Sequence, residues 1–409
     1  MSLNTFTTLG LTESLLHALA RERLVEPTPI QASAIPHLLA GRDLLGIAQT
    51  GTGKTAAFAL PMLQHLITAP ARSNHFATRA LILVPTRELA LQIDDSLRRL
   101  ADRQALRIVA ILGGVSRFMQ TQRMRGGADI VVGTPGRICD LMATGELKLN
   151  QVSQFVLDEA DRMLDLGFIR DVRRIVAALP DKRQSSLFSA TMPPEVATLA
   201  ETLLHNPLRV DVARSAPCGL PIEQHVHFVE PAGKKALLGR LLADPVLSRV
   251  IVFTRTKRGA NQVADALETG GLQVAALHGN KTQPARQKAL EQFRTGRARV
   301  LVATDIAARG IDVTGISHVI NFDLPAQPED YVHRIGRTAR AGASGVAISF
   351  CDITQQDVLR KIEHMTGTSL QIAGSEATPI QSQRQVHTKS RPSSRDRRGR
   401  RTRTLRPAA

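Results

Sequence analysis

The stretch Ala48-Gln49-Thr50-Gly51-Thr52-Gly53-Lys54-Thr55 follows an apolar run at residues 44–47 and precedes a segment rich in Ala and Phe. Its two glycines let the backbone turn so that several N–H groups point inward, and a turn of this kind cradles phosphate groups. Lys54 can then reach the β- and γ-phosphates of a nucleotide, and Thr55 can hold Mg²⁺. The sequence therefore predicts a phosphate-binding loop, in a variant form because Ala48 stands where the general pattern has Gly.

A large excess of basic residues predicts a polyanionic partner. The formal net charge is +17, and residues 389–406 contain nine Lys or Arg and one Asp, so about half of the excess lies in the C-terminal tail. The absence of Trp and the single Tyr argue against broad aromatic stacking on nucleic-acid bases as the main contact. At 409 residues the chain is too long to fold around a single hydrophobic core, so we expect two domains and a tail.

The cysteines and the hydropathy indicate the compartment. Three cysteines far apart in the chain, Cys139, Cys218 and Cys351, predict neither a disulfide framework nor a zinc site, and a reducing cytosol suits them. There is no secretion-signal pattern and no apolar run of 18 residues. We therefore expect a soluble, cytoplasmic protein with no membrane partner.

Short apolar strands alternate with amphipathic helices in both halves of the chain, which predicts an α/β fold with parallel sheets covered on both faces. Ligands bind such sheets at the carboxyl ends of the strands. Several polar or glycine-containing stretches directly follow a predicted strand, and they are therefore candidates for the site: residues 85–90, 113–114, 134–137, 158–161 and 189–191.

Breaks in this alternation predict the domain boundaries. We expect a first domain at residues 1–207, a linker rich in Pro and Gly at 208–222, and a second domain at 223–365. The second half lacks a Gly-Lys-Thr turn, so we expect it to have no phosphate loop of its own and to contribute residues to the nucleotide site of the first half. Residues 366–409 are expected to form a disordered basic tail that binds phosphates without sequence preference, with a role in solubility as the alternative.

The run Asp158-Glu159-Ala160-Asp161 follows the predicted strand at residues 155–157. An Asp at the end of a buried strand can hold Mg²⁺ directly or through water, and the next carboxylate can orient or deprotonate an attacking water. An acidic helix N-terminus, favourable with the helix dipole, is the alternative.

Two further stretches have a chemical interpretation. Arg337 and Arg340 stand three residues apart, so on a helical turn they share a face and could stabilise a developing phosphoryl charge. A basic surface helix is the alternative. Gln31 begins a helix after Pro27-Thr28-Pro29, and its amide suits the edge of adenine, although a capping or surface Gln is commoner.

Taken in order, these stretches resemble the DEAD-box RNA helicases over roughly residues 1–365. Through residues 253–257, residues 278–281 and the basic tail, the chain is most similar to the RhlE-like bacterial subgroup. The resemblance implies two tandem RecA-like domains that use ATP and Mg²⁺ to unwind or remodel RNA. The implied RNA is single-stranded or a short duplex, bound without sequence specificity, with ribosomal precursors or the RNA-decay machinery as candidate partners.

The resemblance also implies roles for individual residues. Catalysis is expected of Lys54, Glu159, Arg337 and Arg340. Nucleotide contacts are expected of Phe6, Gln31, Thr50, Gly51, Thr52, Gly53, Lys54, Thr55, Asp158 and Asp312, with Thr55 and Asp158 holding Mg²⁺, partly through water. RNA contacts are expected of Pro85, Thr86, Arg87, Gly113, Gly114, Thr134, Arg137, Gln283, Arg286 and Thr304. Coupling between the domains is expected of Asp161, Ser189, Thr191 and His333.

The chain departs from the family pattern at two positions. Leu24 stands where the family usually has an aromatic residue, so stacking on adenine from that side is lost. Ala339 stands where the family usually has Gly between Thr338 and Arg340, and the added methyl group could displace Arg340 if the backbone must approach closely there.

Two other functions remain open. An ATP-gated RNA clamp or scaffold with slow turnover is the main alternative, although it would not need Lys54, Glu159, Arg337 and Arg340 together. A DNA helicase would share the phosphate loop, but it would not be expected to combine residues 27–31 with Asp158-Glu159-Ala160-Asp161.

Overall fold

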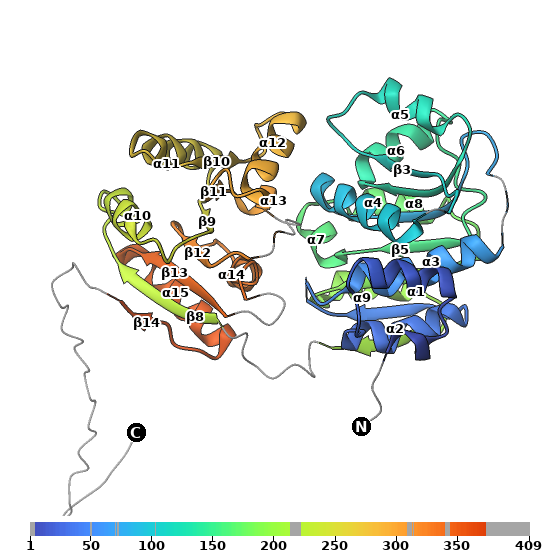
Figure 1. The fold of residues 1–409 in the computed structure, drawn as a ribbon, viewed down its shortest axis with the longest axis horizontal. Coiled ribbons are helices and arrows are strands. Elements are labelled where there is room, and N and C mark those ends of the chain that lie inside the picture. Colours follow the sequence, from blue (N-terminus) through green and yellow to red (C-terminus); the bar gives the residue numbers. More distant parts are fainter. Residues whose placement is uncertain are drawn as a thin grey trace, which may run out of the picture.

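A computed structural model describes residues 5–49, 51–69, 71, 73–102, 104–212, 222–308, 313, 315–339 and 344–373. It contains two α/β domains, each built on one parallel sheet with helices on both faces (Figure 1). The predicted fold class is therefore confirmed. No helix in these ranges is both long and apolar enough to cross a bilayer.

The first domain contains seven strands and the helices that connect them. Its elements are η1 (Phe6–Leu9), α1 (Glu13–Arg21), α2 (Pro29–Leu39), β1 (Leu44–Ile47), α3 (Lys54–Thr68), β2 (Thr78–Leu83), α4 (Arg87–Ala101), β3 (Ile108–Ile111), α5 (Arg117–Met124), β4 (Ala128–Gly133), α6 (Pro135–Ala143), β5 (Gln154–Leu157), α7 (Ala160–Asp165), α8 (Ile169–Val176), β6 (Gln184–Ser189), α9 (Pro194–Leu203) and β7 (Leu208–Asp211).

The second domain follows the same plan. Its elements are β8 (Ile222–Phe228), α10 (Lys234–Ala243), β9 (Val250–Phe253), α11 (Lys257–Thr269), β10 (Val274–Leu277), α12 (Gln283–Arg294), β11 (Val300–Ala303), α13 (Asp305–Ala308), β12 (His318–Asn321), α14 (Pro328–Ile335), β13 (Gly345–Cys351), η2 (Ile353–Gln355), α15 (Gln356–Thr366) and β14 (Gln371–Ile372).

The two sheets have the same strand order. The first runs β3-β4-β2-β5-β6-β1-β7, and the second runs β10-β11-β9-β12-β13-β8-β14. When the strands of each domain are counted from its own first strand, the two orders are identical, with β8 in the place of β1 and β12 in the place of β5. The second domain is thus a topological copy of the first.

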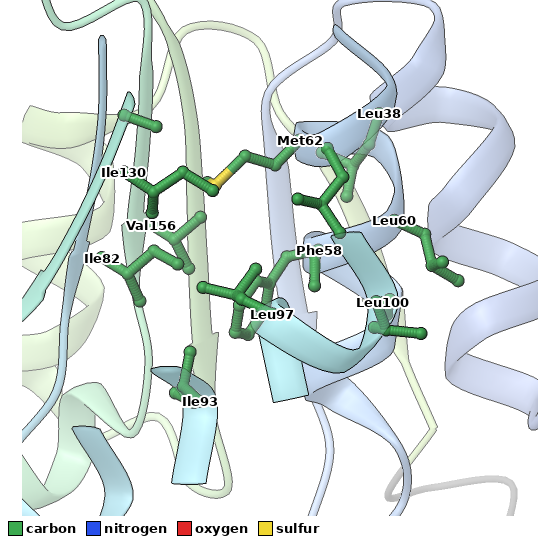
Figure 2. Close-up of a cluster of buried hydrophobic side chains, with 14 of the residues drawn as sticks. Leu38, Phe58, Leu60, Met62, Ile82, Ile93, Leu97, Leu100, Ile130 and Val156 are labelled. Atoms are coloured by element: carbon green, nitrogen blue, oxygen red, sulfur yellow. The ribbon is translucent and has the colours of Figure 1, made fainter. Parts of the chain in front are cut away.

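The central strands of each sheet, such as β1, β5, β9 and β12, are fully buried because helices cover both faces. In the first domain, one face of the sheet packs against α3 and α4 through a cluster that includes Phe58, Leu97, Ile82 and Val156 (Figure 2). Phe58 and Phe188 also contact each other, with ring centroids 5.5 Å apart. This packing holds β1 and β5 rigidly, and the two strands carry the phosphate loop and the Asp158 run at their carboxyl ends.

Two predicted boundaries are wrong because edge strands escaped detection. Residues 208–211 form β7, which pairs with β1, so they belong to the first domain and not to the linker. Residues 371–372 form β14, which pairs with β8, so the second domain extends beyond residue 365. Both strands are short and lie at sheet edges. An edge strand has a neighbouring strand on one side only, so its side chains need not follow an apolar pattern.

Two non-glycine residues near the expected site adopt left-handed backbone conformations. Glu159 has φ 54° at the start of α7, and Ala339 has φ 54° after α14. Such a conformation costs a residue with a Cβ about 1–2 kcal/mol, and strain of this kind often marks functional segments. The second position is the one where the family usually has glycine, and its φ supplies the physical reason for that preference.

We predict that Ala339→Gly stabilises the second domain by about 0.5–1 kcal/mol, because relief of the left-handed strain outweighs the extra unfolded-state entropy of glycine. The midpoint of urea unfolding measures this change. The matched control is Ala266→Gly, the same substitution at an exposed position inside α11, which should destabilise by about 1 kcal/mol. Destabilisation by both variants would show that Ala339 is unstrained.

Candidate nucleotide site and nucleic-acid interface

The predicted phosphate loop joins β1 to α3 and places a lysine opposite an aspartate. Lys54 is the first residue of α3, and its Nζ lies 3.8 Å from Oδ1 of Asp158, which directly follows β5. Both residues are buried. No group in the described part of the chain accepts a hydrogen bond from Lys54 Nζ. A buried ammonium without an acceptor suits an anionic ligand such as a phosphate, because leaving it unpaired is costly.

The electrostatics at Asp158 indicate a place for more positive charge. Burial, together with the neighbouring carboxylates of Glu159 and Asp161, raises the pKa of Asp158 to about 6, while Lys54 opposes the shift. A divalent cation would favour the ionised carboxylate. The described residues hold no cluster of three or more His, Cys, Asp or Glu that could bind a metal by itself. This donor set fits a cation that takes its remaining ligands from water and phosphate, as Mg²⁺ does.

Gln31 connects the N-terminus of α2 to the phosphate loop. Its Oε1 accepts from Thr28 N at 2.9 Å, and its Nε2 donates to Gly53 O at 3.0 Å. A Cβ at Gly53, where φ is 92°, would lie 2.4 Å from Gln31 Nε2, so this position requires glycine. One N–H and one lone pair of the Gln31 amide remain for a ligand such as adenine.

The other predicted nucleotide contacts differ in their surroundings. Phe6 is 3% exposed and packs in the core of the first domain, whereas Leu24 is 39% exposed. Thr52 Oγ1 donates to Gln49 O at 2.8 Å and stabilises the loop. Gly51 has φ 87°. Thr55 is half-buried in the first turn of α3. Thr50, Asp312 and Arg340 lie outside the described residues, so their predicted roles stay predictions.

The predicted catalytic carboxylate has a neighbour that the sequence analysis missed. Glu159 is 3% exposed, and its Oε2 lies 3.4 Å from Nε of Arg162, which is only 1% exposed. Neither Nη of Arg162 has a hydrogen-bond partner in the described structure. The Arg162 guanidinium thus lies beside the Glu159 carboxylate, and its Nη groups can donate hydrogen bonds to a ligand. Its position three residues after Glu159 on a helix was a signal in the sequence.

Asp161, Ser189 and Thr191 form one network at the ends of β5 and β6. Asp161 Oδ2 accepts from Thr191 N at 2.9 Å and from Thr191 Oγ1 at 3.0 Å, and Asp161 N donates to Ser189 Oγ at 3.1 Å. Ser189 Oγ donates to Thr191 O at 2.7 Å. The structure therefore brings together three of the four residues predicted to couple the domains, and all three belong to the first domain.

In the second domain, a buried arginine organises the region of the predicted arginine fingers. Arg334 makes two bonds to the Asp305 carboxylate, at 2.6 and 2.8 Å, and also donates to Asn321 Oδ1 at 3.1 Å. Its guanidinium lies 5.1 Å from the centroid of the Phe253 ring. Arg337 follows α14, is 3% exposed, and donates from Nε to His333 O at 3.3 Å. Arg334, which the sequence analysis missed, thus anchors the helix that presents Arg337.

The second domain has its own lysine–aspartate pair at the equivalent position. Lys234 begins α10 after β8, and its Nζ donates to Asp323 Oδ1 at 3.3 Å. Asp323 Oδ2 also accepts from Arg255 N at 3.0 Å. Lys234 Nζ thus has an acceptor within its own domain, whereas Lys54 Nζ has none in the described part of the chain. The expectation that this domain owns no phosphate loop therefore gains a physical reason.

Residues predicted to contact RNA in the two domains meet at the N-terminal ends of α4 and α12. Arg286 Nε donates to Glu88 Oε1 at 2.8 Å, and Gln283 Nε2 donates to the same oxygen at 3.3 Å. Arg87 Nη1 lies 3.5 Å from Gln283 Oε1. Glu88 lies in the candidate stretch at residues 85–90 but was given no role of its own, and it is the buried acid that binds both residues. Its charge gave no such signal in the sequence, because an acidic residue is favourable in the first turn of a helix such as α4.

Arginines also approach the glycines that follow β3. A Cβ at Gly114, where φ is 70°, would lie 2.1 Å from Arg87 Nη1. Arg137 Nη1 donates to Val115 O at 3.1 Å. Burial lowers the pKa of Arg87, and the nearby Arg286 lowers it further, so the cations crowd one another. Such crowding suits a polyanion.

The remaining predicted RNA contacts lie at strand ends. Thr86 caps α4 by accepting from Leu89 N at 3.3 Å. Pro85 and Thr134 are buried, and Thr304 is half-buried between β11 and α13. In the second domain, burial lowers the pKa of His278, and Lys281, Arg286 and Lys257 lower it further, which marks another concentration of positive charge.

Comparisons with known proteins agree with this arrangement. The family model described as DEAD/DEAH box helicase matches residues 28–199, and the model described as helicase conserved C-terminal domain matches residues 233–342. The ATP-dependent RNA helicase CshA of Listeria monocytogenes is 43% identical over 90% of this chain and 69% of its own length. CshA of Geobacillus kaustophilus is 41% identical over 89% of this chain and 77% of its own length.

Solved structures share the whole two-domain fold. Dbp5 of S. cerevisiae bound to RNA and ADP BeF3 is 33% identical with a TM-score of 0.81, covering 90% of this chain and 95% of that one. The DEAD-box helicase Mss116 bound to ssRNA and UDP-BeF is 27% identical with a TM-score of 0.82, covering 92% of this chain and 81% of that one. The buried Lys54–Asp158 pair, the duplicated sheets and these likenesses together show that the chain belongs to the DEAD-box family of ATP-dependent RNA helicases.

Proposed function

We propose that this protein hydrolyses ATP in response to RNA and uses the cycle to unwind or remodel short RNA duplexes locally. One observation carries the proposal: residues predicted to contact RNA in both domains meet, because Gln283 and Arg286 donate to Glu88 and Arg87 lies 3.5 Å from Gln283. RNA that engages these residues would act on both domains at once. The nucleotide residues of the first domain lie at the carboxyl edge of the same sheet as Arg87.

The proposed chemistry assigns each group a task that suits its surroundings. Lys54 binds the β- and γ-phosphates, and Glu159 accepts a proton from the attacking water. Arg337, with Arg340, stabilises charge that develops on the phosphoryl group. Thr55 and Asp158 would hold Mg²⁺, which, when bound, neutralises phosphate charge. The network of Asp161, Ser189 and Thr191 keeps the ends of β5 and β6 in register.

Coupling between the ligands follows from linkage. If ATP and RNA each contact both domains, each ligand favours the conformation that the other binds, and each strengthens the binding of the other. Binding through phosphates and 2′-hydroxyls would make recognition selective for RNA but blind to its sequence.

We also propose a subgroup, a cellular compartment and partners for this protein. Residues 253–257 and 278–281 and the basic tail support a place in the RhlE-like subgroup, although the relatives described above are CshA proteins. We propose a cytoplasmic protein whose partners are ribosomal precursors or the RNA-decay machinery. Its three cysteines, two of which are buried and free in the structure, suit a reducing compartment.

We predict that single-stranded RNA stimulates ATP hydrolysis and that Glu159→Gln lowers the stimulated rate by about a hundredfold or more, because the general base is lost. Binding of ATP should persist, since Lys54 is unchanged. A steady-state phosphate-release assay with and without RNA measures the rate, and a fluorescent ATP analogue measures binding.

The matched control for this variant is Glu201→Gln, which changes an exposed glutamate on α9 and should leave the stimulated rate unaltered. An unmodified protein that RNA does not stimulate would contradict the proposed function. Equal stimulation by single-stranded DNA would contradict selectivity for RNA. Slow turnover with tight, ATP-dependent RNA binding would favour the alternative of a clamp or scaffold.

We predict that removal of residues 381–409 weakens RNA binding and makes its salt dependence shallower, because the deleted segment includes nine Lys or Arg between residues 389 and 406. ATP hydrolysis without RNA should be largely kept. Titrations of labelled RNA at several salt concentrations give the affinity and the slope. If both remain unchanged, the tail serves solubility.

A further inference from the structure

Three apolar side chains form a short solvent-exposed patch on the first domain. The patch consists of Val115, Phe118 and Met119, which are 39%, 66% and 52% exposed. The chain contains 12 Phe, all within the described residues, and Phe118 is the only one of them that is exposed. Phe118 and Met119 are consecutive residues in the first turn of α5, and Val115 lies two residues before this helix begins.

The fold does not require this exposure, because other residues hold α5 in place. Gln120 Oε1 accepts from Leu112 N at 2.7 Å, and Gln120 Nε2 donates to Leu112 O at 3.0 Å. Arg117 Nε donates to Glu146 Oε2 at 2.9 Å, and Met124 is buried in the core. The helix is thus anchored by its opposite face, and it displays the patch in a fixed position.

The patch is continuous with residues that the proposed function assigns to RNA. Gly114 directly precedes Val115, and Arg137 donates to Val115 O at 3.1 Å. Figure 1 shows α5 beside α6, the helix that carries Arg137. Residues 115–127 contain three Arg and no Asp or Glu; Arg117 is paired with Glu146, whereas Arg123 and Arg125 are exposed near the end of α5. Positive charge around an apolar face suits a ligand with phosphates and unstacked bases.

We propose that Phe118, flanked by Val115 and Met119, stacks on a nucleobase of RNA bound along the first domain. The inference rests on the proposed function, because it adds a base contact to the same RNA path. Every base offers a π-face, so one stacked base raises affinity without imposing sequence specificity. Stacking would also hold one base out of a helical stack, which favours single-stranded over paired RNA at this point.

The absence of Trp from the chain makes a direct test available. In the full-length protein, Phe118→Trp introduces a single tryptophan whose fluorescence reports stacking. Oligouridylate should quench this fluorescence in the presence of a non-hydrolysable ATP analogue, whereas an abasic oligomer with the same phosphates should not. Phe118→Ala should weaken oligouridylate binding about five- to tenfold and leave binding of the abasic oligomer unchanged.

The control is Ile353→Ala, which removes an equally exposed apolar side chain (67%) from the second domain and should not change RNA affinity. Urea unfolding checks that Phe118→Ala folds as the unmodified protein does. Equal RNA affinity of Phe118→Ala and the unmodified protein, or equal quenching by both oligomers, would overturn the inference and assign the patch to a protein partner instead. Failure of the unmodified protein to bind any RNA would overturn the proposed function itself, and the inference with it.

Discussion

The pairing of a buried lysine with a buried aspartate across two strand ends is the constraint on which the nucleotide site depends. Lys54 and Asp158 come from segments about a hundred residues apart, and the pairing of β6 with both β1 and β5 brings them together. Removing two charges from water is costly unless each finds partners. At 3.8 Å, with no hydrogen bond from Lys54 Nζ within the described residues, the pair is incomplete, and a phosphate with a cation would complete it.

The duplicated topology shows how one fold serves two tasks. Lys234 and Asp323 occupy the places of Lys54 and Asp158, but a direct hydrogen bond and a backbone N–H satisfy them. The second domain is therefore closed to a phosphate at that position. We propose that its contribution lies elsewhere, in Arg337 after α14 and in Gln283 and Arg286 on α12. Under the proposed function, this asymmetry between the copies would make hydrolysis depend on how the domains meet.

Communication between nucleotide and RNA needs groups that belong to both sites or that bridge the domains. Asp161 accepts hydrogen bonds from Thr191 after β6, so these bonds connect the segment after β5 with the segment after β6. Glu88 binds Arg286 and Gln283 from the other domain, next to Arg87. Buried charged contacts of this kind form or break together. They therefore suit a transition between two arrangements of the domains better than a gradual change.

The sequence by itself determined the α/β class, most strands and helices, the phosphate loop and the candidate residues at the strand ends, because these features depend on local spacing and residue chemistry. Only the tertiary structure decided the features that depend on partners distant in the chain. These are the edge strands β7 and β14, the burial of Glu88, Arg162 and Arg334, the left-handed Ala339, and the exposure of Phe118. Burial is set by what packs against a residue, and local sequence does not record it.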